Sequence, residues 1–145
     1  MNAKQYLRSI RHGQRELRIL REKRDYLYNS LLPSGIRYDK DTVQTSPDDT
    51  MPEKVESMLE LDEKLRDMIH DLERRELMAL SVIQKITESE HRQVLILYYL
   101  TMREDNSLLS WEDVATKICK EVRQTQRIHE IALKEFAKIS KNVIG

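Results

Sequence analysis

The hydrophobic positions between residues 2 and 32 recur at alternating steps of three and four residues in an otherwise charged segment. This spacing places one narrow apolar seam along an α-helix. Gly13 and Arg24 also fall on the seam, so it is imperfect. The pattern predicts one long helix over about residues 2–32, with the seam residues Tyr6, Ile10, Leu17, Leu20, Leu27 and Leu31.

A second seam of the same kind follows a stretch without helical period. Residues 33–51 hold Pro33 and the pair Ser46-Pro47, which favour a long connecting loop. Thr50 and Glu53 have the spacing of a capping box, so a helix is expected to begin there and to run over about residues 52–86. Its predicted seam consists of Val55, Met58, Leu65, Ile69, Leu72, Ala79, Ile83 and Ile86, broadened by Leu61 and Met68.

Two long helices with single seams can bury them by folding into an antiparallel hairpin. The first helix is strongly basic, whereas the segment from Asp39 to Glu76 has thirteen acidic and six basic side chains. A basic helix beside an acidic one supports this pairing. We therefore interpret the arginine run mainly as a paired or solvated face, with direct nucleic-acid contact as the alternative. Because polar positions interrupt both seams, residues 1–86 are expected to form a homodimer.

The last third of the chain has the pattern of three shorter helices. Thr87 and Glu90 suggest a capping box before a helix over about residues 91–100, with Val94, Leu95, Leu97 and Tyr98 facing inward. After the polar stretch 101–108, Ser110 and Asp113 form a second such box before a helix whose inward residues are Trp111, Val114, Ala115 and Ile118. The turn 119–121 leads into a final helix from Val122, with inward residues Thr125, Ile128, Ala132, Phe136 and Ile139.

The short turn between the last two helices forces them to cross steeply, which is typical of a helix-turn-helix. In that motif the second helix enters the major groove of DNA. Since arginine pairs with guanine and glutamine with adenine, the predicted base-reading residues are Arg123, Gln124, Gln126 and Arg127. Lys120, Lys134 and Ser110 are the predicted phosphate contacts. The sequence thus predicts an all-α protein with a helical hairpin over 1–86 and a helix-turn-helix unit over 87–145.

Composition agrees with an all-α class, since 34% of residues are charged, 6% are aromatic, and glycine and proline occur three times each. A net charge of zero argues against nucleic-acid binding, but residues 119–145 carry six basic and three acidic side chains. The single cysteine, Cys119, excludes an internal disulfide and favours a reducing compartment. With neither a signal-peptide pattern nor a membrane span in the sequence, we expect a cytoplasmic protein.

Motifs of enzyme chemistry are absent from the sequence. There is no glycine-rich phosphate loop, no nucleophile elbow and no helical His-Glu-x-x-His pattern. The histidines His12, His70, His91 and His129 lack metal-ligand spacing and are interpreted as solvated surface. We therefore expect no enzymatic activity, no metal, no cofactor and no small-molecule substrate.

Two stretches near the C-terminus carry a family resemblance. LSWEDVATKI followed by RQTQRIHEIAL resembles region 4 of bacterial RNA polymerase sigma factors, with Ile128, His129, Ala132 and Leu133 matching the end of the reading helix. Residues 1–7, MNAKQYL, and 43–46, VQTS, extend the resemblance to short sigma-like proteins of phages and prophages of Gram-positive bacteria. The turn departs from the family pattern, with Cys119 and Glu121 in place of glycine and a capping serine or threonine.

The resemblance implies a transcriptional regulator that binds promoter DNA and contacts RNA polymerase or other phage factors. No segment resembles the sigma region that melts DNA, so the expected role is regulation and not that of a self-sufficient sigma factor. Two alternatives stay open. One is a DNA-packaging protein of the small-terminase kind, and the other is a protein–protein interaction module that does not bind DNA.

Overall fold

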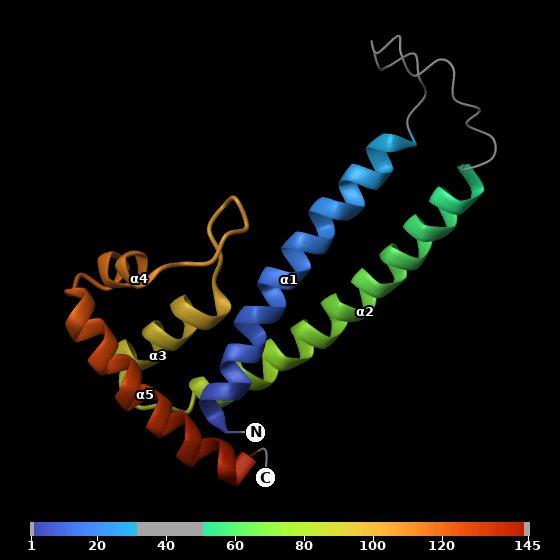
Figure 1. The fold of residues 1–145 in the computed structure, drawn as a ribbon. Helices are drawn as coiled ribbons and strands as arrows, with labels where there is room; N and C mark the ends of the chain where they lie inside the picture. The colour runs from blue at the N-terminus through green and yellow to red at the C-terminus, as the bar shows by residue number, and fades with distance from the viewer. Residues whose placement is uncertain (1, 32–50, 144–145) are drawn as a thin grey trace. The chain divides into compact units, whose positions relative to one another are not determined.

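The computed structural model describes residues 2–31 and 51–143. Within them all regular structure is helical, apart from one isolated bridge between Met102 and Leu108. The elements are α1 (Ala3–Ser30), α2 (Met51–Ile83), α3 (Ser89–Leu95), the π-helical turn η4 (Ile96–Leu100), α4 (Trp111–Lys117) and α5 (Val122–Val143) (Figure 1). The all-α prediction is confirmed, and the helices begin and end close to the expected residues.

Two further findings concern these same residues. No helix within residues 2–31 and 51–143 carries an apolar stretch long enough to cross a membrane. Residues 33–50 of the predicted loop 33–51, with the 43–46 motif and the predicted Thr50 cap, lie outside the described residues, and Met51 is the first residue of α2.

The chain divides into two compact units, and α1 and α2 contribute to both. The larger unit comprises residues 1–16 and 70–145, and the smaller unit comprises residues 17–69. The boundary expected near residue 86 therefore falls inside the larger unit. The first half of α1 and the second half of α2 share one core with the C-terminal helices.

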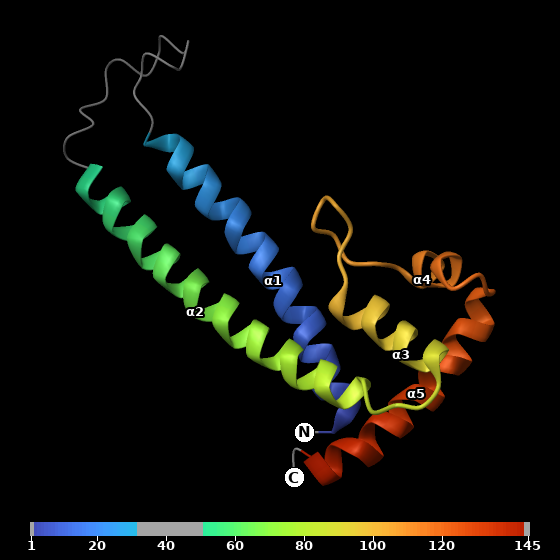
Figure 2. The ribbon, with the colours of Figure 1, turned by 180° about the vertical axis from the view of Figure 1, so that it is seen from behind.

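The core of the larger unit is formed by side chains from five elements. Leu7 and Ile10 of α1 lie with Val82 and Ile83 of α2, and all four are fully buried. Within this unit α3 and α5 lie side by side, as Figures 1 and 2 both show. The remaining buried members are Ala79, Ile86, Leu95, Tyr99, Ala132, Leu133 and Phe136. Burial of this continuous apolar set is the main stabilising term of the larger unit.

Gly13 interrupts the predicted seam of α1 because another side chain fills its position. A Cβ atom on Gly13 would lie 2.5 Å from Cδ2 of Leu72, which is itself buried. Nearby, the side-chain amide of Gln14 donates to Glu76 Oε1 at 2.8 Å, and the Tyr6 hydroxyl donates to the Arg75 carbonyl at 3.2 Å. The glycine thus permits close packing of α1 against α2 in the larger unit.

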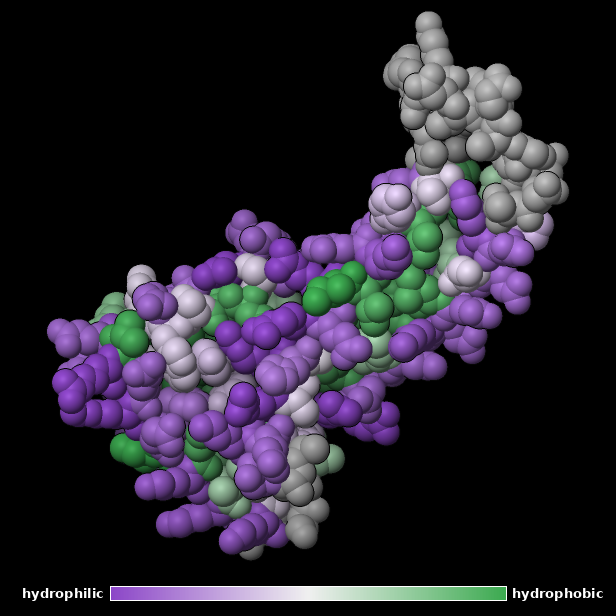
Figure 3. Space-filling model, viewed as in Figure 1, coloured by the Kyte–Doolittle hydropathy of each residue, from purple (hydrophilic) through white to green (hydrophobic). Residues whose placement is uncertain are grey.

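The smaller unit buries less of its apolar surface. Leu17 and Leu65 are buried, and Arg24 Nη1 lies 3.3 Å from Asp62 Oδ1 across the two helices. Figure 3 shows hydrophobic surface along this part of α1 and α2. Among the described residues of this unit, the large apolar side chains that are exposed are Ile19, Tyr26, Tyr28, Met51, Val55 and Leu59, so the predicted seam position Val55 faces solvent.

The start and the end of the predicted helix 91–100 differ from expectation. The N-cap is Glu88, with no side-chain hydrogen bond, so the capping box predicted at Thr87 and Glu90 is wrong. The last turn is π-helical, and its wider winding places Tyr99 in the core, 1% exposed, while Tyr98 stays partly exposed. The Thr101 hydroxyl then donates to the Ile96 carbonyl at 2.9 Å, where the helix ends.

Candidate nucleic-acid interface

The start of α4 is held by a capping box, as predicted. The Ser110 hydroxyl accepts from the Asp113 backbone N–H at 3.2 Å, and the Asp113 carboxylate accepts from the Ser110 backbone N–H at 2.8 Å. The Arg103 guanidinium also contacts this carboxylate. The hydrogen bonds from Ser110, with the Arg103 charge, lower the pKa of Asp113 below its ordinary value. The cap is therefore strongest at pH values at which the Asp113 carboxyl is ionised.

The turn between α4 and α5 is a Schellman motif. The Lys120 N–H donates to the Ala115 carbonyl at 3.0 Å, and the Cys119 N–H donates to the Thr116 carbonyl at 3.2 Å. Cys119 sits at the left-handed position of this motif, with φ 59°. Glycine is favoured there because a Cβ costs about 1 kcal/mol in that conformation. The departure from the sigma-like pattern thus falls at the residue whose backbone conformation best suits glycine.

One face of α5 is anchored in the larger unit. Thr125, Ala132 and Phe136 are buried and Ile128 is half-buried, as the spacing predicts. The Thr125 hydroxyl donates to the Glu121 carbonyl at 2.9 Å. The orientation of α5 about its own axis is therefore set by its apolar face.

The opposite face of α5 is open to solvent over its first two turns. All four predicted base-reading residues lie there and are exposed, namely Arg123, Gln124, Gln126 and Arg127. Neither arginine forms an ion pair with any residue that the structure describes. Ile131, one turn after Arg127, is 49% exposed on the same face. Ile131 was not predicted as part of this surface, although an isoleucine outside the seam positions of the helix is a sequence signal for it.

The three predicted phosphate contacts differ in their surroundings. Lys120 is exposed, and its Nζ lies 3.6 Å from Glu90 Oε2. Lys134 is exposed on α5. Both the hydroxyl and the backbone N–H of Ser110 donate to Asp113. Ser110 therefore uses its donors inside the cap, and the two lysines are the exposed cations of the set.

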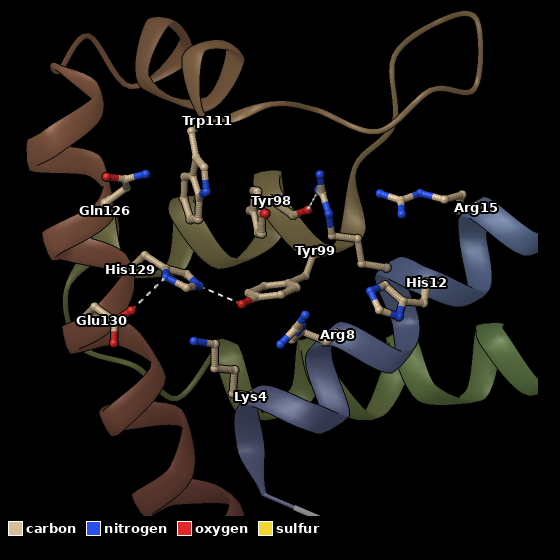
Figure 4. A pocket seen from close by; sticks show the side chains of 11 residues that line it. Lys4, Arg8, His12, Arg15, Tyr98, Tyr99, Trp111, Gln126, His129 and Glu130 are labelled. Atoms are coloured by element: carbon tan, nitrogen blue, oxygen red, sulfur yellow. Dashed lines mark hydrogen bonds and ion pairs between the residues drawn. The ribbon is translucent and has the colours of Figure 1, made fainter.

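Beside α5, the larger unit contains a pocket that the sequence did not predict. It has a volume of about 620 Å³ and is rich in cations on one side (Figure 4). We call it the basic pocket. It is lined by Lys4, Arg8, Arg11, His12 and Arg15 of α1, by Tyr98, Tyr99 and Trp111, and by Gln126, His129 and Glu130 of α5. Helical spacing brings the α1 residues onto one stripe.

Aromatic rings form part of the pocket wall. The Tyr98 ring stacks on Trp111, with centroids 3.9 Å apart and planes 10° apart, and the Arg11 guanidinium lies 3.9 Å from the Tyr98 ring centroid. Arg11 also donates to the carbonyls of Tyr98, at 2.6 Å, and Leu109, at 2.9 Å. Burial lowers the pKa of Arg11 from its ordinary value. Arg11 therefore ties α1 to the π-helical turn and to the segment before α4 through both of its terminal nitrogens.

A buried tyrosine–histidine pair lies behind this wall. The Tyr99 hydroxyl and His129 Nε2 are 2.6 Å apart, and His129 is 5% exposed. Burial lowers the pKa of His129 to about 4 and raises that of Tyr99. At neutral pH the imidazole is uncharged, so one of its nitrogens donates and the other accepts.

Two of the four histidines differ from the expectation of solvated surface. His129 is buried, and His91 is half-buried in contact with Glu135, whereas His12 and His70 are exposed. The signal for His129 was present, because it lies four residues after Thr125 and three before Ala132, on the inward face of α5. In the described part of the chain no cluster of histidine, cysteine or carboxylate side chains is placed to hold a metal ion.

The basic run of α1 is only partly neutralised. Arg24 contacts Asp62 of α2, and Arg18 pairs with Glu22 of its own helix at 3.4 Å. Lys4, Arg8 and Arg15 line the basic pocket instead; all three are exposed and form no ion pair with a described residue. In this part of α1 the basic run is thus a solvated face and not a face paired with the acidic helix.

Comparison with models of known protein families, with curated proteins and with solved structures finds no match for this chain. The function is therefore inferred from the geometry and charge of the candidate interface, together with the sequence resemblance.

Proposed function

We propose that this protein is a transcriptional regulator that binds double-stranded DNA through a helix-turn-helix formed by α4 and α5. The observation that carries the proposal is the asymmetry of α5. One face is buried from Thr125 to Phe136, and the other presents four unpaired base-reading side chains in its first two turns. A recognition helix requires both properties, because the anchored face orients the side chains that reach base edges.

The chemistry of the exposed face suits the major groove. Arg123 and Arg127 can each donate two hydrogen bonds to guanine, and Gln124 and Gln126 can pair with adenine. Each such pair discriminates against the wrong base by about 1–3 kcal/mol. Lys120 and Lys134 would contact flanking phosphates.

The rest of the chain would support this unit. The hydrogen bonds of Tyr6 and Gln14 with α2 support pairing of the first half of α1 with the second half of α2. The exposed apolar residues of the smaller unit, among them Ile19 and Leu59, suit a homodimer contact. By its resemblance to sigma region 4, the protein would act on phage or prophage promoters in the bacterial cytoplasm and contact RNA polymerase.

The base-reading assignment is tested by measuring binding to the duplex that the wild-type protein selects from a library of random sequences. We expect Arg123→Ala/Arg127→Ala to weaken binding to the preferred duplex by about tenfold or more and to remove the preference over unrelated duplexes. Lys138→Ala/Lys141→Ala is the matched control, since it removes the same charge from the other end of α5 and should leave the preference intact. Retention of the preference by the arginine variant, or absence of duplex binding by the wild-type protein, would refute the proposal.

A reconstituted reaction with core RNA polymerase tests the regulatory role. Without another sigma factor, we expect no promoter-specific initiation, because no segment of the chain resembles the DNA-melting region. Initiation from a specific start site by this protein and core polymerase alone would show a complete sigma factor. Rings of many subunits in solution, in place of a dimer, would favour DNA packaging.

A further inference from the structure

The basic pocket contains cations that form no ion pair with any residue that the structure describes. Lys4, Arg8 and Arg15 lie on one stripe of α1, and none of them pairs with a described carboxylate. The first and the last are eleven positions apart, which corresponds to about 16 Å along a helix. One DNA strand presents about five phosphates over that axial length, at about 3.4 Å each. The stripe therefore matches a polyanion in both charge and length.

Gln126 connects this stripe to the proposed reading face. It is exposed on the first turns of α5 and also lines the basic pocket opposite the α1 cations (Figure 4). A duplex whose major groove receives the start of α5 would have a sugar–phosphate strand next to Gln126. That strand would then lie at the pocket.

The pocket suits a strand of DNA better than a small anion. Its free cations are exposed, so each one binds a single phosphate weakly and several contacts are needed. The buried polar groups, Tyr99 and His129, bond to each other, and His129 is uncharged at neutral pH. Both faces of the Tyr98 ring are covered, by Trp111 and Arg11, so Tyr98 cannot stack on the base of a free nucleotide.

We infer that the basic pocket is a second DNA-binding surface, in which Lys4, Arg8 and Arg15 bind backbone phosphates of the duplex that α5 reads. This inference rests on the proposed function. It assigns sequence-independent affinity to the first half of α1 and base discrimination to α5. A neutral protein can then bind DNA, because the cations are gathered on the side that meets the duplex.

Glu130 provides a test of opposite sign. Its carboxylate lines the same pocket and is exposed, 3.8 Å from His129 Nδ1. A fixed negative charge at this position repels backbone phosphates. Glu130→Gln is therefore expected to strengthen duplex binding.

The decisive experiment measures affinity for the preferred and for an unrelated duplex between about 50 and 200 mM salt. Arg8→Gln/Arg15→Gln should weaken binding to both duplexes by the same factor. It should also reduce the magnitude of the slope of log affinity against log salt by about 2. Over that salt range the variant should then lose about tenfold less affinity than the wild-type protein. Arg18→Gln/Lys23→Gln, in the second half of α1, is the matched control and should leave the slope unchanged. Thermal unfolding of each variant checks that the fold is retained.

Each other outcome overturns the inference. If Arg8→Gln/Arg15→Gln leaves affinity and slope unchanged while Arg123→Ala/Arg127→Ala weakens binding, the proposed function stands and this inference fails. If the variant lost affinity for the preferred duplex alone, Arg8 and Arg15 would be assigned to base recognition and not to phosphate binding. Tight binding of ATP that depends on Arg8 and Arg15, without a change in duplex binding, would assign the pocket to a free nucleotide. Absence of duplex binding by the wild-type protein refutes both proposals.

Discussion

The two halves of α1 each carry four lysine or arginine residues but have different surroundings. Residues 3–16 belong to the larger unit, bury Leu7 and Ile10 completely, and present cations to the basic pocket. Residues 17–30 belong to the smaller unit, where Arg24 pairs with Asp62 and the side chain of Ile19 is 58% exposed. In the second half of this helix Arg18 and Arg24 are paired with carboxylates, whereas Lys4, Arg8 and Arg15 of the first half form no ion pair with a described residue.

This difference shows why a count of basic residues does not predict a binding surface. Arg15 and Arg18 lie one turn apart, but Arg18 pairs with Glu22 while Arg15 faces the basic pocket. An exposed ion pair contributes only about 0–1 kcal/mol to stability, so its main effect here is to neutralise the field of the arginine. The electrostatic field of the unpaired cations in the first half is not neutralised in this way.

The largest expected difference between the halves is in the cost of removing a buried side chain. Ile10→Ala, at a fully buried position, should lower the free energy of unfolding by about 2–5 kcal/mol. Leu20→Ala, at a half-buried position of the second half, should cost about 1 kcal/mol. Denaturant unfolding followed by circular dichroism measures both. Equal losses would contradict the division of α1 between a well-packed and a loosely packed unit.

The second prediction is a difference in how the buried His129 and the exposed His70 affect the pH dependence of stability. The pKa of His129 is lowered to about 4 in the folded protein, so the unfolded chain binds its proton first as the pH falls. The stabilisation is complete above the unfolded pKa of about 6.5 and is lost between there and pH 4, by up to about 3 kcal/mol. His129→Gln should flatten this dependence when the free energy of unfolding is measured from pH 7 to 4. His70→Gln, at an exposed position, is the control and should keep it; a flat wild-type profile would refute the assignment.

The smallest expected effect is the difference in lost stability between a substitution of Arg11, in the first half of α1, and one of Arg24, in the second half. Arg11→Lys should cost about 1–3 kcal/mol, because an ammonium group cannot replace the forked donation to the Tyr98 and Leu109 carbonyls. Arg24→Lys should change stability by less than about 1 kcal/mol, since its pair with Asp62 is partly exposed. Thermal unfolding of the two variants measures the contrast. Similar shifts for both would mean that Arg11 does not hold α1 against the π-helical turn.

Most helices were predictable because their signals are local. The three- and four-residue spacing of Thr125, Ile128, Ala132 and Phe136 placed α5 and its inward face correctly. The Ser110 cap was predictable since its partners lie three residues apart. The exposure of Arg123, Gln124, Gln126 and Arg127 followed from the same periodicity.

The sequence-based predictions were wrong or incomplete at two kinds of place. In one, two local sequence patterns compete; in the other, a contact between residues distant along the chain determines the structure. Thr87 and Glu90 have the spacing of a capping box, but the chain becomes helical one residue later, after Glu88. Tyr98 and Tyr99 are both aromatic, so hydrophobic pattern alone could not show that a π-helical turn would bury Tyr99. Gly13 looked like a gap in a seam because the approach of Leu72 depends on a residue 59 positions away.

By itself, the sequence determined where the helices form, which face of α5 is buried and which side chains its other face carries. These properties depend on backbone hydrogen bonds and on periodicities that act within a few turns. The tertiary structure alone decided which cations find a counterion, that His129 loses its charge and that α1 lines a pocket with Gln126. Charge pairing and desolvation depend on groups that are distant along the chain and meet only when it folds.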